Sequence, residues 1–138
     1  AEFGMAFNCV ERVMEYAKSL PSEAPTLADR RPPPGWPLTG ALDVTDLRLR
    51  YRPNLPLVLK GLTFATRPGE RLGIVGRTGA GKSSLLLALL RIVEPEEGSV
   101  VSLDGEDLLA LGLQDLRQGI AMIPQDPVLF QESLRYNV

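Results

Sequence analysis

The stretch Gly76-Arg-Thr-Gly-Ala-Gly-Lys-Ser-Ser84 constrains the fold more than any other part of the chain. It matches the P-loop pattern, in which Gly and four further residues precede Gly-Lys-Ser/Thr. Glycines let successive backbone N–H groups turn inward around an anion. The lysine can then reach phosphate oxygens, and the hydroxyl after it can ligate Mg²⁺. The motif predicts a strand before the loop and a helix after it.

Both flanks of this loop fit that context. Arg71 to Val75 is short and apolar enough for a buried strand, and Ser84 to Ile92 holds strong helix formers without Gly or Pro. A helix that begins here adds free N–H groups and about half a positive charge at its N-terminus. A chance glycine-rich turn beside a solvated lysine is the competing interpretation. We expect a nucleoside phosphate to be bound by Gly76, Thr78, Gly79, Ala80, Gly81, Lys82, Ser83 and Ser84.

The composition excludes several classes of protein. The 138 residues suit one domain or part of a larger one. Lys and Arg number 15 against 17 acidic residues, a net charge of −2, so nucleic acid is not an expected partner. The single Cys9 cannot form an internal disulfide, which suits a reducing compartment. No apolar run approaches the ~20 residues of a membrane span, so we expect a soluble piece.

The first 40 residues show three patterns. The segment Ala1 to Gly4 resembles a vector-derived extension left by cloning, and we exclude it from the fold prediction. Residues 5–20 carry apolar positions at helical spacing, which predicts an amphipathic helix whose stripe packs on the domain, on a missing segment or on a neighbouring chain. Residues 21–40 hold half of the 12 prolines and read as an extended linker, partly polyproline II. Trp36 is either a tether point or a partly exposed aromatic.

From residue 41 the pattern is that of an α/β fold. Strand signals at 41–51 and 57–66 predict an antiparallel β-subdomain over residues 41 to 70, beside a P-loop NTPase core sheet. Further short strands are expected at 99–103 and 120–123, with a helix between them at 113–118. Val101 to Asp104 looks like a Mg²⁺-binding Walker B strand, but Ser102 interrupts it and Asp104-Gly105 is a turn dipeptide. We therefore place no Mg²⁺ on Asp104.

From Leu42 onward the order of features resembles the nucleotide-binding domain of an ABC transporter. Besides the P-loop, the resemblance rests on Leu49-Arg-Tyr-Arg-Pro53, Leu103-Asp-Gly105 and Ile123-Pro-Gln-Asp-Pro-Val-Leu-Phe130. The C subfamily, the multidrug-resistance-associated exporters, is the nearest match, and its second nucleotide-binding domain in particular. Val10-Glu-Arg-Val13 is similar to the end of that subfamily's last membrane-domain helix.

The resemblance implies two further site residues. Tyr51 matches the A-loop aromatic that stacks on adenine, and such stacking would also accept guanine. Gln125 matches the Q-loop glutamine, which completes a Mg²⁺ shell together with Ser83. The alternatives are a tyrosine packed on a strand and an ordinary polar residue in a proline-flanked turn. The segment after Gln125 would contact the membrane domains.

The chain also departs from the family pattern. It contains no Leu-Ser-Gly-Gly-Gln signature, no complete Walker B strand with its following glutamate, and no histidine. We therefore expect residues 41–138 to be the N-terminal part of the domain, truncated before the signature-bearing helical subdomain, and we expect no catalytic residue in it.

Two functions follow from these observations. The first is the ATP-binding portion of an exporter ATPase on the cytosolic face of a membrane, partnered by membrane domains and a second nucleotide-binding domain; alone it would bind Mg-ATP and hydrolyse it poorly. The second is an assembly or dimerisation module with little nucleotide affinity, which self-associates through an exposed sheet edge. A GTPase or small-molecule kinase is disfavoured, because no Asn-Lys-x-Asp or Asp-x-x-Gly motif occurs.

Overall fold

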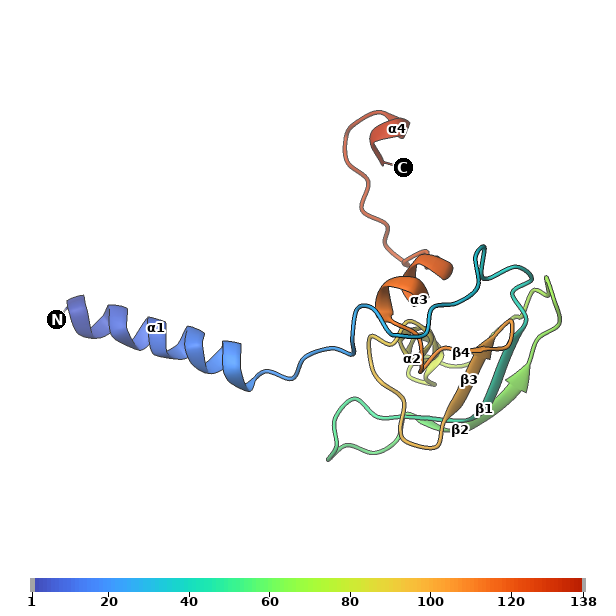
Figure 1. The fold of residues 1–138 in the computed structure, drawn as a ribbon, viewed down its shortest axis with the longest axis horizontal. Helices are drawn as coiled ribbons and strands as arrows, with labels where there is room; N and C mark the ends of the chain where they lie inside the picture. The colour runs from blue at the N-terminus through green and yellow to red at the C-terminus, as the bar shows by residue number, and fades with distance from the viewer. Residues whose placement is uncertain (1, 138) are drawn as a thin grey trace.

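A computed structural model of the chain describes residues 2–137. Figure 1 shows one helix that extends away from a body of sheet and helices, and a C-terminal segment that leaves the body on another side. In chain order the elements are α1 (Glu2–Ser19), β1 (Leu42–Leu49), β2 (Leu59–Ala65), α2 (Lys82–Leu89), β3 (Val100–Leu103), β4 (Glu106–Asp107), α3 (Leu113–Gly119) and α4 (Leu134–Asn137). The coarse expectation of mixed helix and strand with an antiparallel sheet is confirmed.

The sheet is antiparallel throughout, with the strand order β2-β1-β3-β4. Val44 at its centre pairs with Phe64 of β2 on one side and Val101 of β3 on the other. Asp104 and Gly105 connect β3 to β4 with φ angles of 50° and 81°, as a tight two-residue hairpin turn requires. The turn interpretation of this dipeptide is confirmed. The antiparallel part is larger than residues 41 to 70, because β3 and β4 join it.

A bulge in β1 explains a change of phase in its apolar pattern. Val44, Leu47 and Leu49 are all fully buried, although the first two lie three positions apart, an odd spacing that puts side chains on opposite faces of a regular strand. The β1–β2 register shifts between Val44 and Leu47, and Asp46 in that interval has a φ of 49° and donates its N–H to Thr63 Oγ1. The extra residue returns the following side chains to the core face.

The core lies between the sheet, α2 and the segment around α3. Leu85 and Ala88 of α2 meet the buried faces of β1 and β3, and Leu108 and Leu116 join the same cluster. The helix ends at Leu89, earlier than the predicted Ile92. Two residues beyond the helix, Arg91 has a φ of 49°, a backbone conformation that no regular α-helix contains.

The expected P-loop core sheet is not formed in residues 2–137. Neither Arg71–Val75 nor Ile120–Ile123 is a strand, and both run as irregular backbone. Val75 is 97% exposed and Ile123 is 90% exposed. An apolar strand of this kind becomes stable only with paired neighbours and covered faces. Among the described residues every strand belongs to the antiparallel sheet, so the prediction of these two strands is wrong for this part of the chain.

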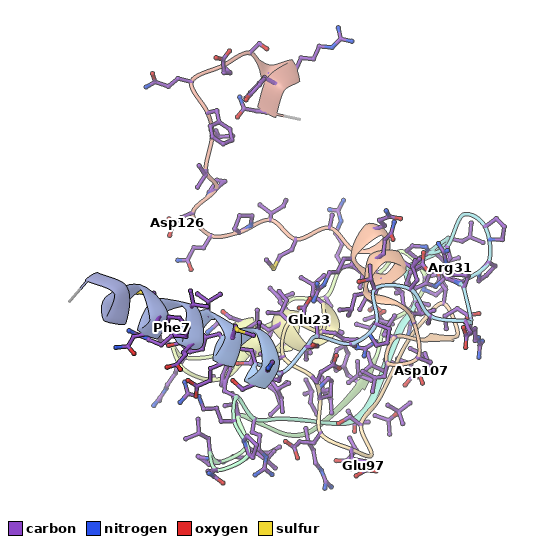
Figure 2. The ribbon with its side chains drawn as sticks, turned by 60° about the vertical axis from the view of Figure 1, so that its left-hand side comes forward. Phe7, Glu23, Arg31, Glu97, Asp107 and Asp126 are labelled. Carbon is purple, nitrogen blue, oxygen red and sulfur yellow. The ribbon has the colours of Figure 1, made fainter. Side chains whose placement is uncertain are left out.

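The amphipathic helix is present, and its apolar stripe is open. α1 begins at Glu2, inside the segment set aside as cloning residue. Phe7 is 69% exposed and Val13 is 66% exposed, and Figure 2 shows the Phe7 side chain standing on this helix. Within residues 2–137, no helix combines the length and the apolar character needed to cross a bilayer.

The proline-rich segment lies against the body in an ordered path. Trp36 packs on the core cluster and donates its indole N–H to the carbonyl of Leu103 at 2.9 Å, so it is the tether point. Trp36 N–H also bonds Pro33 O at 3.1 Å, and Gly35 has a φ of 81°. Residues 33–36 therefore form a β-turn and not a polyproline II stretch.

Ion pairs fasten the same segment at three points. Arg30 pairs with Glu106 at 2.8 Å, and Arg31 pairs with the buried Asp115. Glu23 pairs with Arg117 at 2.8 Å, which lowers the pKa of the Glu23 carboxyl through the hydrogen bond from the guanidinium and through its charge. The partners lie on β4 and α3, so these contacts join the segment to that side of the body.

Candidate functional site

Two glycines give the P-loop its shape. Gly79 and Gly81 have φ angles of 81° and 90°, which L-residues with a Cβ rarely adopt. Gly81 also needs space, because a Cβ there would lie 3.1 Å from the Leu59 side chain at the start of β2. The N–H of Ala80 closes a turn on Arg77 O at 3.1 Å. The loop is thus held tightly between β2 and the start of α2.

Lys82 folds back over the loop. Its ammonium donates to the carbonyl of Gly76 at 2.6 Å and to that of Arg77 at 2.9 Å. An ammonium has three donors, so one remains for an anion in the loop. The contacts place the positive charge above the loop backbone, at the beginning of α2.

The first turn of α2 presents free donors beside this charge. The first helical bond runs from Leu85 N to Gly81 O at 3.1 Å. The N–H groups of Lys82, Ser83 and Ser84 therefore have no acceptor within the helix. Gly81 has no side chain to cap them, and the first turn contains no acidic residue. The helix N-terminus keeps its partial positive charge for an outside anion.

These groups open into a pocket of about 600 Å³, a size typical of small-molecule sites. The pocket brings together residues from four separate parts of the sequence. Its lining consists of Tyr51, Val58, Thr78, Gly79, Gly81, Lys82, Ser83, Ser84 and Gln125. Of the predicted site residues, Gly76 and Ala80 do not line it. Gly76 accepts the Lys82 hydrogen bond, and Ala80 lines a neighbouring hollow beside β2.

Tyr51 reaches the P-loop helix directly. Its hydroxyl lies 2.9 Å from Ser84 Oγ, and either oxygen can be the donor. Tyr51 follows the end of β1 and is 47% exposed, whereas Ser84 is 4% exposed. Tyr51 therefore lines the pocket with about half of its surface exposed.

Gln125 brings a more C-terminal segment into the lining of the same pocket. It lies in the exposed segment that follows α3, next to Asp126, which Figure 2 shows on the stretch leading away from the body. Its amide supplies both an acceptor oxygen and donor hydrogens. The sequence pattern alone does not predict that Gln125 lines the same pocket as Lys82, because β3, β4 and α3 lie between these two residues along the chain.

Val58 is a lining residue that no motif in the sequence singles out. It lies within the strand signal at residues 57–66. In the structure it precedes β2, and its N–H donates to Leu49 O at 2.7 Å, which brings it near Tyr51. Its side chain also lies close to Gly81, at 3.5 Å from where a Cβ would be. Val58 thus adds an apolar side chain to the pocket lining, close to Gly81.

Asp104, the rejected Walker B candidate, has another role. Its carboxylate accepts hydrogen bonds from the backbone N–H groups of Leu38, Thr39, Gly40 and Ala41, at 2.7 to 3.1 Å. The hydrogen bonds from Thr39, first from its hydroxyl and then from its backbone, hold the pKa of Asp104 well below its usual range. The carboxylate therefore anchors the chain entering β1, outside the pocket.

The geometry of a glycine loop, a lysine and a free helix N-terminus defines a phosphate-binding class of protein, and comparison with known proteins agrees. The family model described as "ABC transporter" matches residues 59–137, more than half of the chain. This chain therefore belongs to the ABC transporter family.

Curated relatives place the chain more narrowly. It is 50% identical over 129 residues to the human "ATP-binding cassette sub-family C member 2", which covers 94% of this chain and 8% of that protein. It is 49% identical to "ABC transporter C family member 12" of Dictyostelium discoideum, over 95% of this chain and 10% of that protein. A relative from Zea mays, "ABC transporter C family MRP4", is 47% identical over 94% of this chain and 8% of its own length.

The resemblance to the C subfamily is thereby confirmed. The chain corresponds to the nucleotide-binding part of these transporters, as the match to the family model over the P-loop indicates. It spans a tenth or less of the length of the relatives named above.

Proposed function

We propose that this chain holds Mg-ATP as part of an ABC exporter. One observation carries the proposal: Tyr51, Lys82 and Gln125, which come from separate segments, line one pocket at the N-terminus of α2. A triphosphate is the anion that best matches a lysine, three free N–H groups and two serine hydroxyls in so small a space.

Phosphate binding would use the third donor of Lys82. The other two donors of its ammonium bond the carbonyls of Gly76 and Arg77. A β- or γ-phosphate oxygen forms a stronger, charge-assisted hydrogen bond than a neutral carbonyl does. The lysine is therefore already positioned over the loop, and its reorganisation on binding is small.

Tyr51 would provide the face for the base. An offset-stacked aromatic pair contributes about 0.5–1.5 kcal/mol beyond its area burial. Tyr51 lines the pocket and is 47% exposed, so a base can cover its ring without displacing core residues. Stacking accepts either purine, and no residue of the lining is assigned to the base edge.

Ser83 and Gln125 fit a Mg²⁺ ion that arrives with the nucleotide. Both line the pocket with neutral oxygen atoms, and Mg²⁺ commonly binds one or two protein oxygens together with phosphates and waters. No group of three His, Cys, Asp or Glu side chains gathers anywhere in the described residues, so a metal cage made of protein alone is not the arrangement expected here. When bound, the ion would neutralise phosphate charge while the two side chains hold its position.

Hydrolysis would be slow in this chain alone. The lining contains no carboxylate or imidazole to accept a proton from water. A positioned water, a general base and the opposing surface of a partner contribute much of the rate in such reactions. We infer that this chain is part of the second of two nucleotide-binding domains in a transporter. Its partners would then be the other nucleotide-binding domain and the membrane domains, with this chain on the cytosolic face.

Isothermal titration of Mg-ATP tests the proposal. Lys82→Ala removes the charge above the loop, and Lys18→Ala on α1 removes an equal charge far from the pocket. We expect saturable binding by the parent chain and by Lys18→Ala, with at least ~10-fold weaker binding by Lys82→Ala, the loss of about 1.4 kcal/mol or more. Equal affinity of the two alanine variants would contradict the proposal.

One observation favours the second function, an assembly module. A groove of about 400 Å³ is lined by apolar side chains that include Leu72, Ile74, Leu86 and Ile120. Leu72 is 51% exposed and Ile74 is 47% exposed. Together with the free outer edge of β2, this surface is suited to self-association. Sedimentation of the chain with and without Mg-ATP tests it: a monomer at micromolar concentration in both conditions would exclude this function.

A further inference from the structure

The hydrogen bond between Tyr51 and Ser84 connects two lining residues of the pocket that are 33 positions apart in the sequence. Their oxygens are 2.9 Å apart, and the two residues come from the turn after β1 and from the first turn of α2. Ser84 is nearly fully buried, so few hydrogen-bond partners from solvent can reach its hydroxyl. The ring proposed to stack on a base is thus joined to a serine proposed to touch a phosphate.

The chemistry of the two hydroxyls limits how they share their hydrogens. Each has one hydrogen to donate and two lone pairs to accept. If Ser84 donates to Tyr51, its hydrogen is not free for a ligand. If Tyr51 donates to Ser84, the serine hydrogen is free for an oxygen in the pocket. A phosphate oxygen that carries no hydrogen can only accept, so a bound phosphate selects the second arrangement.

A chain of two hydrogen bonds results, from Tyr51 to Ser84 and from Ser84 to phosphate. Hydrogen bonds in series polarise one another and strengthen each other. We propose that Tyr51 is a positioning residue for the phosphate group, acting through Ser84, in addition to any contact with the base. This inference rests on the proposed function, because it requires that the pocket bind a phosphate.

A ligand without a base separates this role from stacking. Tripolyphosphate with Mg²⁺ offers the phosphates alone, and Tyr51→Phe keeps the ring while it removes the hydroxyl. We expect Tyr51→Phe to bind tripolyphosphate about 3- to 10-fold more weakly than the parent chain, the effect of one hydrogen bond. Mg-ATP binding should weaken by a similar factor. Tyr16→Phe on α1 is the matched control and should leave both affinities unchanged.

A double-mutant cycle shows whether the effect passes through Ser84. We expect Ser84→Ala to weaken tripolyphosphate binding and Tyr51→Phe to add nothing to it, because the intermediary has been removed. Additive losses would overturn the proposal, since the two residues would then act independently. Thermal unfolding of each variant verifies that the chain remains folded.

The outcomes also distinguish this inference from the function on which it rests. Binding by the parent chain that is lost in Lys82→Ala but unchanged in Tyr51→Phe would overturn the positioning role and leave the phosphate site intact. A parent chain that binds neither tripolyphosphate nor Mg-ATP would overturn both. Equal weakening of the two ligands by Tyr51→Phe supports the proposal, since a residue that only stacks would leave both affinities nearly unchanged in a variant that keeps the ring.

Discussion

The indole N–H of Trp36 donates to the carbonyl oxygen of Leu103 at 2.9 Å and so joins the proline-rich segment to the end of β3. The same ring occupies the space beside α3, where a Cβ on Gly119 would lie 2.6 Å from it. One side chain thus holds together a strand, a helix and a segment that has no regular structure. The body of the protein includes this segment.

Removing the Trp36 side chain should destabilise the chain. We expect Trp36→Ala to lower the free energy of unfolding by about 3 kcal/mol, because the ring packs on the core cluster. Trp36→Phe keeps much of the packing and loses the hydrogen bond, so its cost should be smaller, about 1 kcal/mol beyond the change in volume. Urea unfolding measures both values. Equal stability of the parent chain and Trp36→Ala would show that the segment is not held by this residue.

A methyl group at Gly119 should also lower the stability of the folded chain, because it would clash with the Trp36 ring. A Cβ there has no space beside Trp36, whereas a Cβ at Gly73 would meet nothing within 4 Å. Neither glycine has a positive φ, so backbone conformation does not separate them. We expect Gly119→Ala to lose about 1–3 kcal/mol of stability and Gly73→Ala to be nearly neutral. Thermal unfolding of the two variants measures the difference, and similar unfolding midpoints for Gly119→Ala and Gly73→Ala would contradict the tight contact.

Asp104 should make stability depend on pH. Its pKa is lowered in the folded chain, so the unfolded chain binds the proton more readily. The stabilisation is therefore full above the unfolded value of about 4 and is lost as the pH falls through the lower folded pKa. Asp104→Asn tolerates the left-handed backbone but removes the charge.

The parent chain should accordingly be more stable than Asp104→Asn at pH 7, and the difference should shrink below about pH 4. Asp29→Asn, at an exposed carboxylate in the proline-rich segment, is the control and should show little difference at either pH. A constant gap between the parent chain and Asp104→Asn from pH 7 to pH 2 would contradict the role assigned to the carboxylate.

ATP turnover by the chain alone should be at or near background. The lining offers phosphate and Mg²⁺ ligands but no side chain that can act as a general base. Phosphate release at saturating Mg-ATP measures it, with Lys82→Ala as the blank. Rapid turnover that disappears in Lys82→Ala would show that the residues present suffice for hydrolysis.

Local sequence patterns predicted the elements that are specified by residues close to one another in the sequence. The P-loop and the start of α2 follow from glycine spacing and from the run of helix formers after Lys82. The strands β1 and β2 follow from their strand signals, but only the structure shows the bulge before Leu47. The Asp104-Gly105 turn was likewise local.

Features that depend on distant partners were not predictable in the same way. Arg71–Val75 has the composition of a buried strand, but composition does not say whether a pairing partner is present. The path of residues 21–40 depends on Trp36 and on ion pairs to residues 75 or more positions away, such as Glu106 and Asp115. The contact of Tyr51 with Ser84 depends on how the end of β1 passes the start of α2.

We propose above that Mg-ATP binds at the N-terminus of α2 between Tyr51, Lys82 and Gln125. Backbone amide NMR during a titration with Mg-ATP tests it most directly, since it locates the ligand as well as detecting it. We predict saturable shifts of the amide signals of Ser83, Ser84 and the P-loop glycines, with a smaller shift at Tyr51 and no change along α1. Saturable shifts confined to other parts of the chain, or no shifts at millimolar Mg-ATP, would contradict the account.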